Sequence, residues 1–80
     1  MGVTEDISDE LARETLKILD ATGDDSVITQ ISSALGGYSQ TMEEAYLTAV
    51  RVRRAEQRAR LLLDQIKSKV QKQIADDGTA

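Results

Sequence analysis

The residues in this chain best suited to binding chemistry are the arginines of the segment RVRRAEQRAR, residues 51–60. Arginine binds phosphates and carboxylates through paired hydrogen bonds. At 100° per residue, three of these arginines and two later lysines share one side of a helix: Arg51, Arg54, Arg58, Lys69 and Lys72. We call these five residues the basic ladder. The ladder is expected to contact an acidic protein surface or phosphate groups, unless it is only a solvated helix face.

Few side chains in this sequence are suited to catalysis or to metal binding. The chain contains no histidine and no cysteine, which removes the commonest general base and the commonest zinc ligands. Asp20, Asp24 and Asp25 surround Gly23, but they lack the alternating spacing and the closing glutamate of a calcium loop. We therefore expect no catalytic residue, no metal site and no cofactor.

The segment GDDSV, residues 23–27, places a serine after two aspartates at the start of a predicted helix. It resembles the attachment site of acyl carrier proteins, in which Ser26 would carry a phosphopantetheine group. Val27 stands where that family has leucine, and the long loop before the family's serine is missing here. The N-terminus of a helix explains the segment without a cofactor.

Apolar residues recur at helical spacing in three segments, which glycines separate. The first helix is predicted over about residues 8–21, the second over about 25–35 and the third over about 42–75. Residues 76–80 are expected to be frayed. The predicted fold is all-α, with two short helices followed by one long C-terminal helix in a single small helical bundle over residues 1–75.

Capping residues set the predicted ends of these helices. The predicted N-caps are Ser8, Asp24 or Asp25, and Thr41, the last in a capping box with Glu44. Gly23 is expected to adopt the left-handed conformation that ends the first helix, and Gly36 with Gly37 to close the second.

The third helix carries apolar or small residues at alternating spacings of three and four, the heptad pattern of a coiled coil. This seam consists of Met42, Ala45, Ala49, Val52, Glu56, Ala59, Leu63, Ile66, Val70 and Gln73. We expect the two short helices to fold back over its first half, where Ala45 and Ala49 allow close approach. Glu56 interrupts the seam. It pairs with Arg53 or Arg60 across an interface, marks a change of neighbours, or turns to water.

Five large apolar side chains would then project beyond the folded-back helices: Leu62, Leu63, Ile66, Val70 and Ile74. An exposed apolar stripe of this length usually marks an interface, and the simplest partner is a second copy of the chain. We therefore predict a homodimer, in the function class of a non-enzymatic interaction module: an adaptor, a regulator or an assembly factor. In the alternative structure, the first helix swings along the third helix and covers the stripe itself.

The segment ISSALGGYSQTMEEAY, residues 31–46, has apolar, small and turn residues at fixed spacing: Ile31, Ser32, Ala34, Leu35, Gly36, Thr41 and Met42. It resembles the helix-turn-helix of bacterial transcriptional regulators, which implies DNA reading by Gln40 and Thr41 in a dimer. Helix capping and a tight turn explain the same residues without DNA. The carboxylates of Glu43 and Glu44 would also be repelled by DNA phosphates, so DNA binding is kept as the alternative function.

Length and charge favour a partner subunit. A chain of 80 residues with two aromatic residues and no cysteine builds a thin core without disulfides. Residues 1–44 carry a net charge of −8 and residues 45–80 a net charge of +4, so an acidic segment can pack on a basic one within or between chains. No apolar run approaches the ~20 residues of a membrane helix and no signal-peptide pattern is present, so we expect a cytoplasmic protein without membrane contact.

Overall fold

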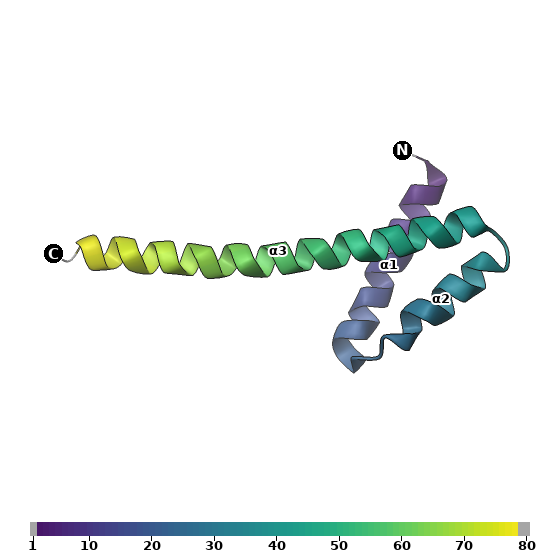
Figure 1. Ribbon diagram of the computed structural model, residues 1–80, viewed down its shortest axis with the longest axis horizontal. Helices are drawn as coiled ribbons and strands as arrows, with labels where there is room; N and C mark the ends of the chain where they lie inside the picture. Colours follow the sequence, from purple (N-terminus) through teal and green to yellow (C-terminus); the bar gives the residue numbers. More distant parts are fainter. Residues whose placement is uncertain (1, 79–80) are drawn as a thin grey trace.

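The computed structural model describes the backbone of residues 2–78 and the side chains of residues 2–75. All of the regular structure in this part of the chain is helical, as predicted (Figure 1). The helices are α1 (Val3–Thr22), α2 (Ser26–Gly36) and α3 (Gln40–Gly78). The molecule is elongated, with extents of 64 × 30 × 13 Å, because α3 runs far past the two shorter helices.

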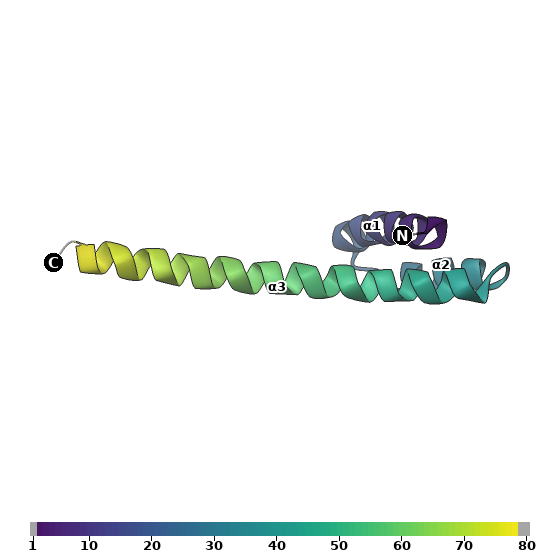
Figure 2. The same ribbon diagram turned by 90° about the horizontal axis from the view of Figure 1, so that it is seen from above.

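The two short helices gather at one end of α3. Helix α2 folds back beside the first half of α3, and α1 lies across the layer that these two helices form (Figure 2). The prediction that the short helices cover only the first half of the long one is confirmed. No helix within residues 2–78 is both long enough and apolar enough to cross a membrane.

Helix α1 begins at Val3, five residues before the predicted start, and Ser8 is not its N-cap. The Glu5 carboxylate accepts a hydrogen bond from the backbone N–H of Gly2 at 3.0 Å, which completes a first turn that the sequence pattern did not reveal. Ser8 instead lies buried against α3, with its Oγ 3.9 Å from Met42 Sδ. A small side chain at this position lets the two helices approach closely.

The turn after α1 follows the prediction. Gly23 has φ 71°, in the left-handed region, and its N–H donates to the Leu19 carbonyl at 2.7 Å. Asp24 Oδ1 then accepts a hydrogen bond from the backbone N–H of Ser26 at 3.0 Å, at the start of α2. Hydrogen bonds from the Ser26 side chain and backbone lower the pKa of Asp24, because they favour its charged form.

The turn between α2 and α3 uses a different cap from the predicted one. Helix α2 ends at Gly36, as expected, but α3 begins at Gln40. The hydroxyl of Ser39 accepts a hydrogen bond from the backbone N–H of Met42 at 3.1 Å, so Ser39 performs the capping role that had been assigned to Thr41. At the other end, α3 continues into the segment predicted to fray and reaches Gly78. Residues 79–80 of that segment lie outside the described residues.

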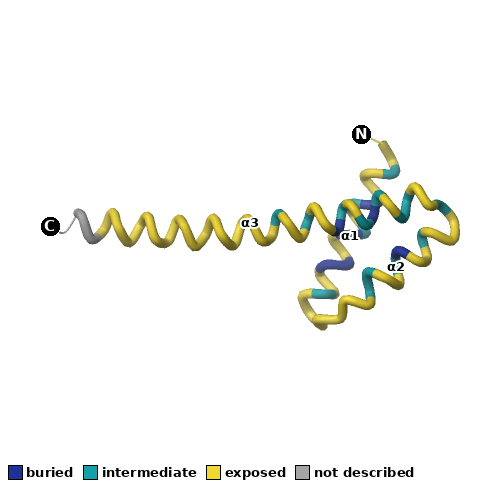
Figure 3. Tube along the Cα trace, viewed as in Figure 1, coloured by how far each residue is buried: buried dark blue, intermediate teal, exposed yellow. Residues whose placement is uncertain are grey.

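The core is small and lies where α1 crosses α3. Its buried members are Ala12 of α1 with Tyr46 and Val50 of α3. Six half-buried apolar side chains from all three helices pack around them: Leu11, Ile28, Ile31, Leu35, Leu47 and Ala49. The buried residues cluster at the crossing, and residues 57–75 of α3 are all exposed (Figure 3).

Candidate interaction surface on helix α3

The predicted self-association residues lie beyond the reach of α1 and α2. They are 47–65 % exposed: Leu62, Leu63, Ile66, Val70 and Ile74. Leu61, beside them, is 64 % exposed. Helix α1 crosses α3 instead of running along it, so the alternative in which α1 covers this stripe is wrong (Figure 1).

Helix α3 has a second face, which α1 and α2 cover. This face is formed by Tyr46 and Val50, which are 0 % and 4 % exposed, followed one turn later by Arg53. Each of these residues comes one position after a residue of the predicted seam, namely Ala45, Ala49 and Val52. One position is a rotation of 100° about a helix axis. The seam therefore lies about 100° around α3 from the buried face.

The close approach predicted at Ala45 and Ala49 holds for Ala49, which packs against the buried cluster, but Ala45 is not among the residues packed there. The centre of the contact with α1 is Tyr46, whose ring fills the crossing, and Ala49 lies only at its edge. The sequence did contain a signal for this face, since Tyr46, Val50 and Arg53 also have a spacing of four and three. The longer run of small and apolar residues at the neighbouring positions concealed it.

We use the name open stripe for the seam residues that remain accessible: Ala45, Ala49, Val52, Glu56, Ala59, Leu63, Ile66 and Val70. The open stripe begins with the smaller residues Ala45, Ala49 and Val52 and ends with the larger residues Leu63, Ile66 and Val70. Its small half is the floor of a shallow groove, lined by Glu5 of α1 with Ala45, Thr48, Ala49 and Val52 of α3. Val52 is 60 % exposed there, although α1 passes close by.

Glu56 sits in the middle of the open stripe and forms ion pairs along its own helix. It lies 3.4 Å from Arg53 Nη1 and 2.9 Å from Arg60 Nη2. The hydrogen bond from Arg60 is the main reason that the pKa of Glu56 is lowered, and Arg53 adds to the effect. Glu56 therefore pairs with both of the arginines considered as its partners, Arg53 and Arg60, but within its own helix.

The main ionic contact between the helices joins Asp9 of α1 to Arg53 of α3. The guanidinium donates to both carboxylate oxygens, at 2.8 Å from Nε and 2.6 Å from Nη2. This bidentate hydrogen bonding lowers the pKa of Asp9 and raises that of Arg53. An acid of the first helix thus binds a basic residue of the third, as considered, but that residue is not part of the basic ladder.

The basic ladder itself is exposed: Arg51, Arg54, Arg58, Lys69 and Lys72. Among the side chains of residues 2–75, the ion pairs involve only Arg53 and Arg60 as bases, and therefore no member of the ladder. Gln40 and Thr41, the predicted DNA-reading residues, are exposed at the start of α3, more than two turns before Arg51. The structure does not bring these two groups together.

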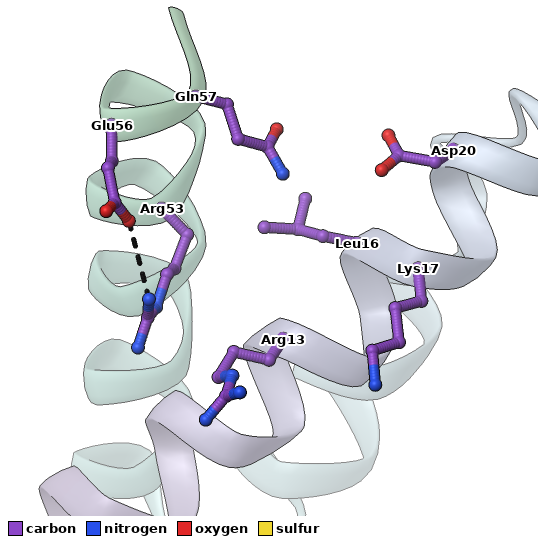
Figure 4. Close-up of a pocket in the computed structure, with 7 residues that line it drawn as sticks. All are labelled: Arg13, Leu16, Lys17, Asp20, Arg53, Glu56 and Gln57. Atoms are coloured by element: carbon purple, nitrogen blue, oxygen red, sulfur yellow. Dashed lines mark hydrogen bonds and ion pairs between the residues drawn. The ribbon is translucent and has the colours of Figure 1, made fainter. Parts of the chain in front are cut away.

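One groove near charged side chains lies between α1 and α3 (Figure 4). It is lined by Arg13, Leu16, Lys17, Asp20, Arg53, Glu56 and Gln57. Its volume of about 210 Å³ is below the ~300–1,000 Å³ typical of small-molecule sites. Arg53 and Glu56 in its wall are already paired with each other and with neighbours. No group of three potential metal-ligating residues occurs among the side chains that the structure describes.

These observations define a small all-α protein in which two short helices pack on one half of a long third helix. Comparison of the chain with protein-family models, with curated proteins and with solved structures finds no match.

Proposed function

We propose that this protein is a non-enzymatic helical interaction module that self-associates through α3, in the role of an adaptor, a regulator or an assembly factor. The observation that carries the proposal is the exposure of five large aliphatic side chains, from Leu62 to Ile74, on a helix that projects from its own bundle. Burying one such side chain contributes about 1.5–3 kcal/mol. Leaving all of them in water is costly unless a partner covers them.

The thin core supports the same proposal. Only four apolar residues are buried in the described part of the chain: Ala12, Leu16, Tyr46 and Val50. A domain of this size with so few buried apolar side chains gains much of its stability from association. A homodimer would bury the apolar face of the second half of α3 and extend the core beyond the crossing.

The basic ladder is proposed to choose the module's further partner. Its side chains are exposed and have no ionic partner among residues 2–75, so they are available to an acidic protein surface. The cytoplasmic location expected from the sequence remains a prediction.

The test is sedimentation equilibrium over a range of protein concentrations. The wild-type chain is expected to be dimeric at micromolar concentration. Leu63→Asp or Ile66→Asp should raise the dimer dissociation constant at least about 100-fold, because each dimer loses two buried side chains. Gln65→Asp is the matched control, since it adds the same charge to the same helix away from the open stripe. A wild-type chain that stays monomeric at the highest concentration would contradict the proposal.

DNA binding by a helix-turn-helix dimer is the alternative, but Gln40 and Thr41 are not brought together with the basic ladder. Helix α2 folds back beside α3, whereas the two helices of that motif cross steeply. Adding a random-sequence duplex at low salt to the same experiment tests it. The alternative predicts a salt-sensitive rise in mass that Gln40→Ala or Arg51→Ala abolishes, and the interaction module predicts no rise.

A further inference from the structure

We propose that two copies of this chain pair through their open stripes in an antiparallel arrangement, with the two-fold axis between Gln57 and Arg58. This inference rests on the proposed self-association and adds its direction, its register and an ionic contact. The occupant of the open stripe is thus a second copy of the same helix.

The sizes of the residues in the open stripe favour antiparallel pairing. Antiparallel heptad helices place each residue of one seam beside a residue of the opposite end of the other seam. With the axis between Gln57 and Arg58, the layers are Ala45 with Val70, Ala49 with Ile66, Val52 with Leu63, and Glu56 with Ala59. Leu63, Ile66 and Val70 each then meet a smaller residue of the first half of the open stripe. Alternating large and small residues across facing positions is how helices fill the space between them.

A parallel pair would match the residues poorly. It would set Ala45 on Ala45 and Ala49 on Ala49, which leaves the first half of the interface with little to bury. It would also place the two bundles side by side at one end, because α1 and α2 both pack on the first half of α3 (Figure 1). Antiparallel pairing puts the two bundles at opposite ends.

The distribution of charge along the chain also favours antiparallel pairing. Residues 1–44 have a net charge of −8 and residues 45–80 a net charge of +4. Parallel helices bring like segments together, whereas antiparallel helices lay the basic second half of α3 beside the acidic bundle of the other copy. Interfaces use such complementarity to suppress wrong arrangements.

One ionic contact follows from the same register. Glu5 is exposed on the rim of the groove over Ala45, Thr48 and Val52. In the antiparallel register, Lys67 of the partner subunit lies level with Thr48. At 100° per residue, Lys67 points in the same direction from the helix axis as Ala49. It therefore lies on the edge of the seam that α1 passes. Glu5 and Lys67 of the partner subunit therefore form an ion pair, twice in the symmetric dimer.

Single-cysteine variants test the direction, because the natural chain contains no cysteine. Val52→Cys and Leu63→Cys replace side chains that are exposed in the single chain, so folding is not at risk. Under thiol–disulfide exchange, a mixture of the two variants is expected to form the mixed disulfide in large excess over either same-site disulfide. Ala45→Cys with Val70→Cys repeats the measurement two layers further out.

Charge reversal tests the register. Lys67→Glu is expected to weaken the dimer about five-fold, and adding Glu5→Lys should restore it. Lys72→Glu, on the other side of α3, is the control and should have no such effect. Same-site disulfides in a stable dimer, or failure of Glu5→Lys to rescue Lys67→Glu, would overturn this inference and leave self-association intact. A monomeric wild-type chain would overturn both.

Discussion

The hydroxyl groups of Thr15 and Tyr46 lie 2.8 Å apart at the buried contact between α1 and α3. The Thr15 hydroxyl donates its proton to the Leu11 carbonyl at 2.9 Å, so Tyr46 must be the donor in the bond between the two side chains. This hydrogen bond allows the largest fully buried side chain of the core to carry a polar atom. Buried polar atoms are costly without such a partner.

Removing the Thr15 hydroxyl and removing the Tyr46 hydroxyl should lower the free energy of unfolding by different amounts. Thr15→Val leaves the Tyr46 hydroxyl buried without an acceptor and should lower the free energy of unfolding by about 2 kcal/mol. Tyr46→Phe leaves Thr15 bonded to Leu11 and should cost only about 1 kcal/mol. The double variant should lose less than the sum of the two. Urea unfolding followed by circular dichroism measures all three, and a larger loss for Tyr46→Phe than for Thr15→Val would contradict the donor assignment.

The ion pair between Asp9 and Arg53 should make stability depend on pH. Its hydrogen bonds lower the pKa of Asp9 below the ordinary value of 3.8, which the carboxyl group has in the unfolded chain. Stability from this group is therefore fully present above that value and is lost as the pH falls through the lower pKa of the folded state. Asp9→Asn should melt at a lower temperature than the wild-type chain at neutral pH, and the difference should shrink below about pH 4.

Thermal unfolding across this pH range measures the effect of Asp9→Asn. Glu14→Gln provides the control, because it removes one negative charge from an exposed position of the same helix. Equal losses in the two variants at neutral pH would mean that general charge, and not the contact with Arg53, sets the stability.

Two glycines should respond in opposite ways to alanine. Gly23 has φ 71°, and although a methyl group there would meet open space, the left-handed backbone disfavours alanine. Gly23→Ala should destabilise the protein by about 1 kcal/mol. Gly37 has φ −66°, and its nearest neighbour to a new methyl group would be the Ala34 carbonyl oxygen at an ordinary 3.5 Å. Gly37→Ala should stabilise by about 0.5 kcal/mol, since it restricts the unfolded chain.

The second half of α3 should be helical only when it is covered. Residues 61–75 have no buried side chain, and an isolated helix of this length is marginal in water. Amide hydrogen exchange of this segment should therefore accelerate on dilution, while exchange near Tyr46 and Val50 changes little. The same contrast should appear at constant concentration in Leu63→Asp. Protection of residues 61–75 that is independent of concentration would show a helix that needs no partner.

Much of this architecture follows from local sequence signals. The positions of the helices, the left-handed Gly23 and the exposure of Leu63 and Ile66 all follow from periodicity and turn chemistry, because each depends on residues close in the chain. The first turn of α1 was missed because its cap is made by Glu5 and not by a conventional N-cap side chain. The predicted self-association residues are exposed together on one helix, whereas Gln40 and Arg51 are not brought together.

The sequence alone determined three helices, their order and the apolar seam of the third, since helix formation and amphipathicity are written in neighbouring residues. Only the tertiary structure decided which face of α3 the bundle covers. Two faces of α3 have the same residue spacing. The face of Tyr46 is the one that is buried, because its ring fills the crossing and its hydroxyl is hydrogen-bonded to Thr15, 31 residues earlier in the chain. That choice rotates the seam outward by about 100° and leaves it accessible. Such a choice depends on shape and hydrogen bonding between distant segments, which no local pattern encodes.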